Sequence, residues 1–455
     1  MYISKIHLEN IRNFRSGLQT VDLDLRRPDG RFAGWTVLAG RNGTGKSTFL
    51  KAIALVIAGP ESARVLQQSF RGWIHAGQDR GTAATELVFD ERFDKPKADA
   101  SLVAGSFWNA LGWGKDDPSA LEPVLAGTSS LDEVLLAHGD GRSHEGDPDG
   151  PWANNPKGWF IAGYGPHRRL TGHALDAQRL MSGPSQIARL VSLFREDASL
   201  VGSVQWLREL HLRRLEKREG AGELLDGVLS LLNDRLLPDG VRIDKVDSDG
   251  LWVTQGGVSL PLWDMSDGYR TVTALILDLA YQLHTAYQEF KLVQQDGTWV
   301  VPYPGVVLID EVELHLHLSW QRRIGFWLKE HFPNIQFIVT THSPFVCQAA
   351  DPKGLIRLPA PGEDRTAEHV SDELYKTVVN GTVDEAALTE LFGLDHVHSD
   401  QSEALREQVA RLEARILRGE ATPEERGQLD QLASQLPDTA STLMERALRK
   451  YGLDK

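Results

Sequence analysis

A glycine-rich segment, placed between an apolar run and a run with helical spacing, constrains the fold of this chain most. Gly40–Ser47 fits the pattern G-x-x-x-x-G-K-[ST], Trp35–Ala39 before it is apolar-rich, and Thr48–Ile53 after it has helical spacing. This order predicts a strand, a loop and a helix, with loop N–H groups turned toward phosphate oxygens. Lys46 would bring its charge to the β- and γ-phosphates, and Ser47 would be a ligand of Mg²⁺. The segment therefore predicts a nucleoside-triphosphate site whose phosphate contacts come from Gly40, Asn42, Gly43, Thr44, Gly45, Lys46, Ser47 and Thr48.

The composition is that of an ordinary globular protein. The chain has 455 residues, 41% of them hydrophobic and 25% charged, which suits two or three domains and a large core. No apolar run reaches the length of a membrane span, and the N-terminus lacks a signal-peptide pattern. Cys347 is the single cysteine, which excludes an intramolecular disulfide and a cysteine-cluster metal site. We therefore expect a cytoplasmic protein without a membrane partner.

Two apolar strands further along the chain end in polar residues suited to phosphate chemistry. Residues 306–309 lead into Asp310 and Glu311, and residues 336–340 lead into His342. Asp310 is placed to hold Mg²⁺ together with Ser47, and Glu311 to polarise an attacking water. His342, at the tip of a neighbouring strand, is placed to donate a hydrogen bond to a γ-phosphate. We therefore predict Glu311 and His342 as catalytic residues and Ser47 and Asp310 as metal ligands.

In this order the motifs resemble those of an ABC-type ATPase. They are similar to the SMC/RecF branch, and within it to stand-alone and OLD-like (overcoming lysogenization defect) prokaryotic AAA/ABC ATPases, including those of antiviral defence systems. The segments that carry the resemblance are Asn10–Arg15, the phosphate loop, Met265–Arg270, Ile309–Glu311, Glu313–His317 and Thr341–Ser343. The resemblance implies an α/β fold, with a P-loop NTPase core, a mixed sheet, a helical signature lobe and a C-terminal helical hairpin. It also implies ATP and Mg²⁺ as cofactors, and hydrolysis of ATP with water to ADP and phosphate.

The resemblance extends to a dimer interface. Ser266 and Gly268 match the signature motif, which in the family caps the γ-phosphate bound by the opposite protomer, and a helix N-terminus attracts anions. This sequence departs from the family pattern at Asp267, where a small residue is usual, and a carboxylate there must face away from the phosphate. Leu314–His317 matches the segment that crosses the interface. The resemblance thus implies a homodimer, or a higher homo-oligomer, that closes around two ATP.

Two assignments within the resemblance stay open. The glutamine-loop role falls either to Gln67 and Gln68, after the first helix, or to the Tyr164–Arg168 segment, which we favour. Arg12 and Arg15 would either contact the nucleotide or lie solvated in a surface turn.

The domain organisation follows from these motifs and from composition. Residues 90–158 are rich in Gly, Asp, Pro, Ser and Asn with little periodicity, which indicates an insertion or a mobile surface segment. Heptad-like leucines over residues 401–437 predict a helical hairpin, with a capping box from Thr422 to Glu425. We predict five parts: 1–89, the N-terminal ATPase core with the phosphate loop; 90–158, a flexible insertion; 159–265, a strand and a helical lobe; 266–360, the C-terminal ATPase core; and 361–455, a C-terminal helical region.

The leading functional hypothesis is an ATP-binding and ATP-hydrolysing switch that controls a separate effector protein in prokaryotic antiviral defence. No strand-bound acid pair of a nuclease occurs in the last hundred residues, and His396 and His398 there are either metal ligands or part of a solvated loop. The alternative is a RecF-like DNA-repair ATPase that acts on DNA ends or gaps. An importer subunit is disfavoured by the Leu314–His317 run.

DNA is a further candidate ligand, although the net charge of −14 argues against a uniformly basic coat. A helical segment carries Arg208, Arg213, Arg214, Lys217 and Arg218. This face would engage nucleic acid or a partner protein, or its arginines would pair with Glu209, Glu216 and Glu219 on an ordinary amphipathic helix.

Overall fold

A computed structural model describes residues 1–17, 19–94, 105–114, 121–128, 130–133, 150–153, 155–168 and 175–437. Within the chain there are two compact units, Met1–Ala386 and Ala387–Lys455. The first unit extends past residue 361, the predicted start of the C-terminal helical region. Much of the predicted insertion and the tail beyond residue 437 lie outside the described residues. In the described ranges, no helix is both long and apolar enough to cross a membrane.

The larger of the two main sheets of the first unit is mostly parallel. Its strand order is β16 (Glu368–His369), β15 (Leu355–Arg357), β3 (Gly34–Ala39), β14 (Ile335–Thr340), β13 (Gly305–Ile309) and β7 (Ile161–Tyr164). All neighbouring strands pair in parallel except β16, which is antiparallel to β15. The strands predicted at 306–309 and 336–340 are confirmed as β13 and β14, and every residue of both is buried.

A second, antiparallel sheet contains the N-terminal strands. Its order is β2 (Val21–Asp24), β1 (Tyr2–Glu9), β4 (Arg80–Val88), β5 (Ser106–Gly114) and β6 (Leu121–Thr128). Strands β5 and β6 lie within residues 90–158, the predicted insertion, and they extend this sheet beyond β4. Seven of the nine residues of β5 are buried, so its small and aromatic side chains pack on both faces of the sheet.

Helix α1 (Lys46–Leu66) lies between the two sheets, since it contacts β4, β5 and β6 as well as β13 and β14. Its apolar side chains are buried around its circumference, as expected for a helix covered on both sides. The helix is interrupted at Gly59, which has a φ of +79° and is followed by Pro60. Residues of α1 and of both sheets form one hydrophobic core, which fixes the start of α1 and hence the phosphate loop before it.

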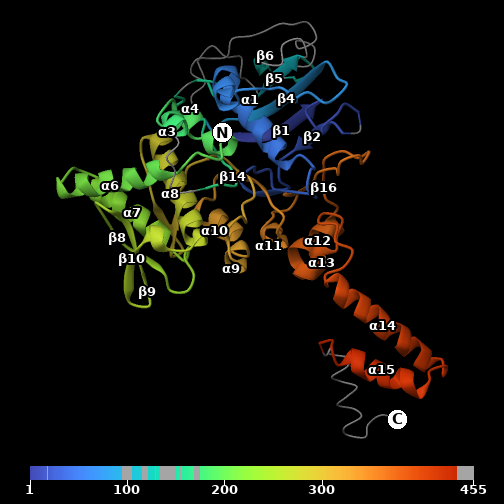
Figure 1. Ribbon diagram of the computed structural model, residues 1–455. Coiled ribbons are helices and arrows are strands. Elements are labelled where there is room, and N and C mark those ends of the chain that lie inside the picture. The colour runs from blue at the N-terminus through green and yellow to red at the C-terminus, as the bar shows by residue number, and fades with distance from the viewer. Residues whose placement is uncertain are drawn as a thin grey trace. The chain divides into compact units, whose positions relative to one another are not determined.

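A lobe of helices and short strands connects β7 to β13. It comprises α3 (Leu175–Met181), α4 (Ser185–Ala188), α5 (Val191–Phe194), α6 (Val201–Leu215), α7 (Ala221–Asn233), β8 (Arg242–Asp247), β9 (Gly250–Gln255), β10 (Val258–Pro261), the 3₁₀ turn η1 (Leu262–Asp264), α8 (Asp267–Tyr287), β11 (Val293–Gln295) and β12 (Thr298–Val300). Figure 1 shows α6, α7 and β8 to β10 grouped at one side of the first unit, next to α8. Strand β7, helices α3 to α7 and strands β8 to β10 all lie within residues 159–265, where the sequence predicts a strand and a helical lobe.

Short helices follow the strands that bear the predicted site. They are α9 (Leu318–Gln321), α10 (Ile324–His331), α11 (Pro344–Cys347), α12 (Asp372–Asn380) and α13 (Val383–Ala387). The second unit contains α14 (Asp400–Leu417) and α15 (Pro423–Ala433), which pack on one another as the predicted hairpin. The predicted capping box is confirmed, because the Thr422 and Glu425 side chains each bond the other's backbone N–H.

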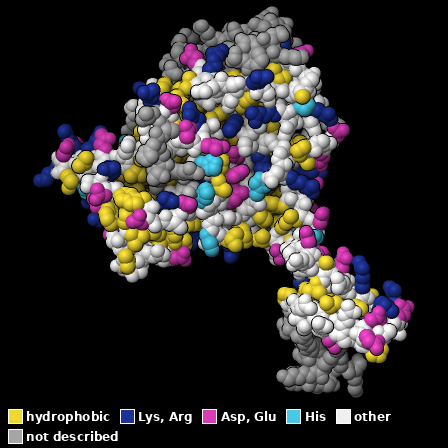
Figure 2. All heavy atoms as spheres, in the orientation of Figure 1, with side chains coloured by type: hydrophobic (Ala, Val, Ile, Leu, Met, Phe, Trp, Pro, Cys, Tyr) yellow, Lys and Arg dark blue, Asp and Glu magenta, His cyan; other side chains and the backbone are white. Residues whose placement is uncertain are grey.

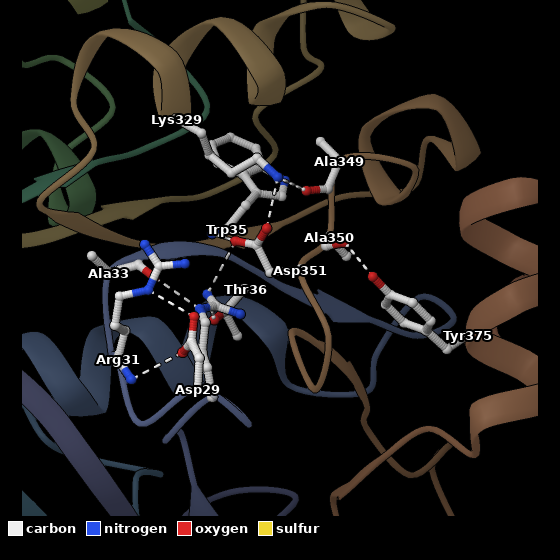
Figure 3. A network of polar contacts seen from close by, with 11 residues as sticks. Asp29, Arg31, Ala33, Trp35, Thr36, Lys329, Ala349, Ala350, Asp351 and Tyr375 are labelled. Carbon is white, nitrogen blue, oxygen red and sulfur yellow. Dashed lines mark hydrogen bonds and ion pairs between the residues drawn. The ribbon is translucent and has the colours of Figure 1, made fainter. Parts of the chain in front are cut away.

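The start of β3, the strand that leads to the phosphate loop, is fixed by a single carboxylate (Figure 3). Asp351 accepts hydrogen bonds from the backbone N–H of Trp35 at 2.7 Å and from the ammonium of Lys329 at 2.8 Å. The buried guanidinium of Arg27 lies 3.6 Å from the same carboxylate. This network holds the far end of β3, and so the strand enters the phosphate loop from a fixed position.

Candidate functional site

The parallel strands bring the predicted site residues to one edge of the sheet. In parallel sheets the carboxyl ends of neighbouring strands meet at the same edge. The phosphate loop follows β3, His342 follows β14, and Asp310 with Glu311 follows β13. Because β14 pairs with both β3 and β13, His342 lies between the loop and the acid pair in strand order. Figure 2 shows histidine and acidic side chains gathered over the region of β14 and α9 to α11.

The phosphate loop has the backbone that its glycines predict. Gly43 and Gly45 have φ values of +81° and +91°, which side-chain-bearing residues rarely adopt. A Cβ atom on Gly45 would also lie 3.0 Å from the ring of Phe14. The side-chain amide of Asn13 donates a hydrogen bond to the carbonyl of Gly43, so the N-terminal turn supports the loop from outside.

The ammonium of Lys46 lies inside the loop. It donates to the carbonyls of Gly40 at 2.8 Å and Arg41 at 3.0 Å, and only 7% of the residue is exposed. Burial lowers the pKa of Lys46, whereas nearby carboxylates, Asp310 first, oppose that shift. The Lys46 ammonium is thus a buried cation, hydrogen-bonded to loop carbonyls, whose charge complements that of a nucleotide phosphate.

The acid pair is oriented by the neighbouring strand. Asp310 is 3% exposed, and its carboxylate accepts a 2.6 Å hydrogen bond from the hydroxyl of Thr340, the last residue of β14. The backbone N–H of Glu311 donates to the same hydroxyl at 2.8 Å. Glu311 itself has a φ of +47°, a conformation that is uncommon outside glycine and is often found at functional sites. Residues 310–312, which we call the acid turn, therefore have a backbone that is fixed by hydrogen bonds but strained at Glu311.

His342 is attached to the segment after the acid pair. The carboxylate of Glu313 accepts hydrogen bonds from the hydroxyl of Thr341, at 2.7 Å, and from the backbone N–H of His342. Desolvation, and then the charge of Lys46, lower the pKa of His342, so its imidazole is biased toward the neutral form. In the sequence, Glu313 stands out only as part of the Glu313–His317 segment. Its hydrogen bonds to Thr341 and His342 are seen only in the structure.

Arg168 is the residue at this edge whose part the sequence did not indicate. It follows β7, is 2% exposed, and donates to the carbonyls of Asp310 at 2.9 Å, Glu311 at 3.0 Å and Val312 at 3.2 Å. Its segment, Tyr164–Arg168, was the favoured glutamine-loop candidate, but its guanidinium donates to the backbone carbonyls of the acid turn itself. The alternative is Gln67 and Gln68, and of these Gln67 donates to the carbonyl of Ser69. The glutamine-loop role stays open.

The signature residues lie at the start of α8. Ser266 is the N-cap of this helix, and Asp267 forms an ion pair with Arg270. A Cβ atom on Gly268 would lie 2.9 Å from the ring of Trp320 and 3.0 Å from the carbonyl of His315. The glycine thus lets α8 approach the segment that continues from the acid pair. Among the contacts recorded for the described residues, none joins Ser266 or Gly268 to the phosphate loop of the same chain.

The two arginines of the N-terminal turn have separate partners. Arg12 lies over the ring of Trp73 at 5.1 Å and donates to the hydroxyl of Thr48 at 3.4 Å, next to the phosphate loop. Arg15 forms an ion pair with Asp364. Of the two, only Arg12 contacts a residue of the phosphate loop region.

The basic face of α6 and the turn after it is largely neutralised. Arg213 pairs with Glu209 at 2.5 Å, Arg214 with Asp226 at 2.6 Å and Arg218 with Glu216 at 3.3 Å. His396, in the second unit, contacts the carbonyl of His398 through Nδ1 at 2.8 Å. Within the described ranges, no group of three or more His, Cys, Asp or Glu is arranged to hold a metal by itself.

Comparison with known proteins assigns both halves of this site to one class of domain. Residues 5–95, which include the phosphate loop, match the family described as "AAA domain". Residues 178–348, which include the acid pair and His342, match the family described as "AAA domain, putative AbiEii toxin, Type IV TA system".

Individual relatives were found among curated proteins and solved structures. The Septu protein PtuA of Bacillus mycoides (strain KBAB4) is 26% identical over 344 residues, which are 75% of this chain and 38% of that protein. The Retron Ec83 probable ATPase of Escherichia coli is 46% identical over 105 residues, 23% of this chain and 18% of that protein. The chain therefore spans well under half the length of these relatives. A crystal structure of the Smc head domain from Pyrococcus furiosus, bound to the C-terminal domain of ScpA, has a TM-score of 0.46 and 18% identity, covering 83% of this chain and 98% of that chain.

The two AAA-domain matches contain the phosphate loop in one segment and the acid pair in the other, in the order that the motifs predict. The resemblance to P-loop ATPases is thereby confirmed. Residues 5–95 and 178–348 of this chain are thus similar to AAA domains, the first segment with the phosphate loop and the second with the acid pair.

Proposed function

We propose that this chain is an ATP-driven switch. It binds ATP with Mg²⁺ at the carboxyl edge of the parallel sheet, hydrolyses it slowly, and closes as a homodimer around two ATP molecules. In this state it controls a separate effector protein in prokaryotic antiviral defence. The observation that carries the proposal is the convergence of Lys46, Asp310 and Glu311 at one sheet edge, with His342 between the loop and the acids.

The residues present fit ATP and Mg²⁺. The loop from Gly40 to Thr48 offers backbone N–H groups at the start of α1, a 21-residue helix whose N-terminus attracts anions. Lys46 would exchange its bonds to loop carbonyls for phosphate oxygens. The Ser47 hydroxyl and the Asp310 carboxylate are the hard oxygen donors that Mg²⁺ prefers, together with phosphate and water. When bound, the ion would neutralise charge on the phosphates during hydrolysis.

Glu311 and His342 supply the chemical groups for hydrolysis. The positive φ of Glu311 ends the regular course of β13, and its carboxylate would accept a proton from the attacking water. His342, biased toward its neutral form, would donate a hydrogen bond to the γ-phosphate oxygens.

The dimer proposal is supported by the surface around Ser266. The close approach of Gly268 to His315 and Trp320 brings the signature end of α8 next to the segment that the resemblance assigns to the interface. Trp263, shortly before Ser266, and Leu318, between His315 and Trp320, are large apolar side chains that are 45% and 57% exposed. A symmetric pair would bury these side chains while each Ser266 meets the partner's phosphate loop.

The effector and the defence role rest on the resemblance and on the relatives. The Retron Ec83 probable ATPase is named as the ATPase of a retron, which fits an ATPase that works as one part of a larger system. The α14–α15 hairpin is the docking site we propose for the effector. A RecF-like role on DNA remains the alternative, and the ion pairs of α6 give it no specific support.

Paired variants test the nucleotide chemistry. Glu311→Gln should bind ATP with parental affinity, but its rate of ATP hydrolysis should fall by about 100-fold or more. The reason is that an amide cannot accept the proton from water. Lys46→Ala should lose ATP binding. Phosphate release and binding of a fluorescent ATP analogue, each with and without EDTA, measure both. Turnover by Glu311→Gln at the parental rate would refute the role of Glu311, and absence of Mg²⁺-dependent turnover in the parent would refute the ATPase proposal.

A further inference from the structure

The side chain of Arg168 is buried without a carboxylate partner in the described part of the chain. Its guanidinium donates to the carbonyls of Gly165, Asp310, Glu311 and Val312 over distances of 2.8–3.2 Å. Burial lowers the pKa of Arg168 to about 10, against the opposing charges of nearby acids, Glu313 first. Burying a guanidinium away from water costs free energy, which its hydrogen bonds to these carbonyls offset. The same hydrogen bonds stabilise the backbone to which the carbonyls belong.

Three of those four carbonyls form the acid turn. They belong to Asp310, Glu311 and Val312, in the stretch where Glu311 adopts its φ of +47°. Three successive carbonyls that point toward one side are mutually repulsive unless a cation or several donors lie among them. The planar fork of an arginine presents several donors at once, which a lysine ammonium at one point in space cannot match.

The opposite side of the same turn is bonded to β7 and, through it, to α8. The backbone N–H of Asp310 donates to the carbonyl of Tyr164 at 2.8 Å. The hydroxyl of Tyr164 donates to the carboxylate of Asp278, in the middle of α8, at 3.0 Å. The acid turn is therefore held between Arg168 on its carbonyl side and a contact with the helix that begins at the signature residue Ser266.

We propose that Arg168 is the positioning residue for hydrolysis, because it holds the 310–312 turn in the conformation that aims the Glu311 carboxylate at the bound phosphate. This inference rests on the proposed function and names a residue that governs the same site. The guanidinium of Arg168 donates to backbone carbonyls, three of which belong to the turn. It acts through the backbone of Glu311, and its loss changes the rate of the chemical step more than the affinity for ATP, since Lys46 and the loop remain in place.

The test compares Arg168→Lys and Arg168→Met with the parent and with Arg189→Lys. Arg189 is a matched control, since it is 3% exposed, lies over the ring of Phe160 at 5.5 Å, and has no contact with the acid turn in the described ranges. Thermal unfolding of each variant, followed by circular dichroism, identifies an assay temperature at which every variant is folded. Steady-state hydrolysis and binding of a fluorescent ATP analogue are then measured with Mg²⁺ present.

Arg168→Lys should lose about tenfold in kcat, with the affinity for the analogue within about threefold of the parent, and Arg168→Met should lose more kcat. Arg189→Lys should lose thermal stability with little change in kcat. Parental kcat in Arg168→Lys, or equal losses of kcat and affinity, would overturn the inference while leaving the ATPase proposal intact. If the parent does not hydrolyse ATP, or Glu311→Gln does not slow it, the proposed function itself fails.

Discussion

The hydroxyl of Thr340 lies between the two acids of the site, donating to the carboxylate of Asp310 at 2.6 Å while accepting the backbone N–H of Glu311 at 2.8 Å. Thr340 is fully buried at the end of β14, the strand between the phosphate loop and the acids. One side chain thus sets the orientation of the proposed metal ligand and the backbone of the proposed catalytic base.

Replacing this hydroxyl should weaken the metal site. Thr340→Val keeps the volume and β-branching of the side chain but leaves the Glu311 N–H without a partner and Asp310 free to rotate. We expect the Mg²⁺-dependent affinity for an ATP analogue to fall about tenfold, which corresponds to about 1.4 kcal/mol. Thr340→Ser, which keeps the hydroxyl, should bind like the parent. Equal affinities in Thr340→Val and the parent, measured in a Mg²⁺ titration, would show that the hydroxyl does not orient Asp310.

The buried carboxyl of Asp278 should make stability depend on pH. Burial raises its pKa from 3.8 to about 7, against the hydrogen bond from Tyr164. The folded state therefore binds this proton more tightly than the unfolded state, so stability is lost as the pH rises from about 4 to about 7. Asp278→Asn accepts the same hydrogen bond without a charge, and it should be more stable than the parent by up to about 4 kcal/mol at pH 8.

The difference between the Asp278→Asn variant and the parent should shrink as the pH falls toward 4. Urea unfolding at pH 5, 6.5 and 8 measures this, with Asp244→Asn, at an exposed position, as a control for loss of a charge. A difference in stability that is the same at all three pH values would contradict a buried carboxyl that is protonated in the folded state.

The imidazole of His342 should matter for turnover more than for binding. Its bond to the γ-phosphate would strengthen as charge develops in the transition state, and removal of one such donor costs on the order of 100-fold in rate. His342→Ala should therefore lower kcat by about that factor and change ATP affinity little. His211→Ala, on α6, is the matched control. If His342→Ala keeps the parental kcat, the γ-phosphate contact assigned to this histidine does not exist.

The motifs with fixed spacing were predictable from the sequence. The phosphate loop follows from local order, since Gly43 and Gly45 are needed at positive φ just before Lys46. The strands before Asp310 and His342 were predictable because they are short, rich in apolar residues and followed by polar ones. Their adjacency follows from parallel pairing, which places β14 between β3 and β13.

The parts that depend on long-range packing were not predictable. Arg168 lies far from Asp310 in sequence, and nothing in its spacing indicates that its guanidinium reaches the carbonyls of the acid turn. Strand β5 was missed because Asn109, Gly112 and Gly114 interrupt its apolar pattern within a polar segment, and its pairing with β4 supplies the order that the local sequence lacks. The role of Thr340 was hidden for the same reason, since a threonine at a strand end has no pattern of its own.

Sedimentation velocity of Glu311→Gln, with and without ATP and Mg²⁺, tests the proposed switch most directly. Because this variant should hold ATP without hydrolysing it, ATP is expected to convert it from a slower to a faster species of twice the mass. Adding Ser266→Arg should abolish the shift, because a bulky cation at the start of α8 would block the partner's phosphate loop. An unchanged sedimentation coefficient on ATP addition, or a dimer that persists with Ser266→Arg, would contradict closure of two copies around ATP.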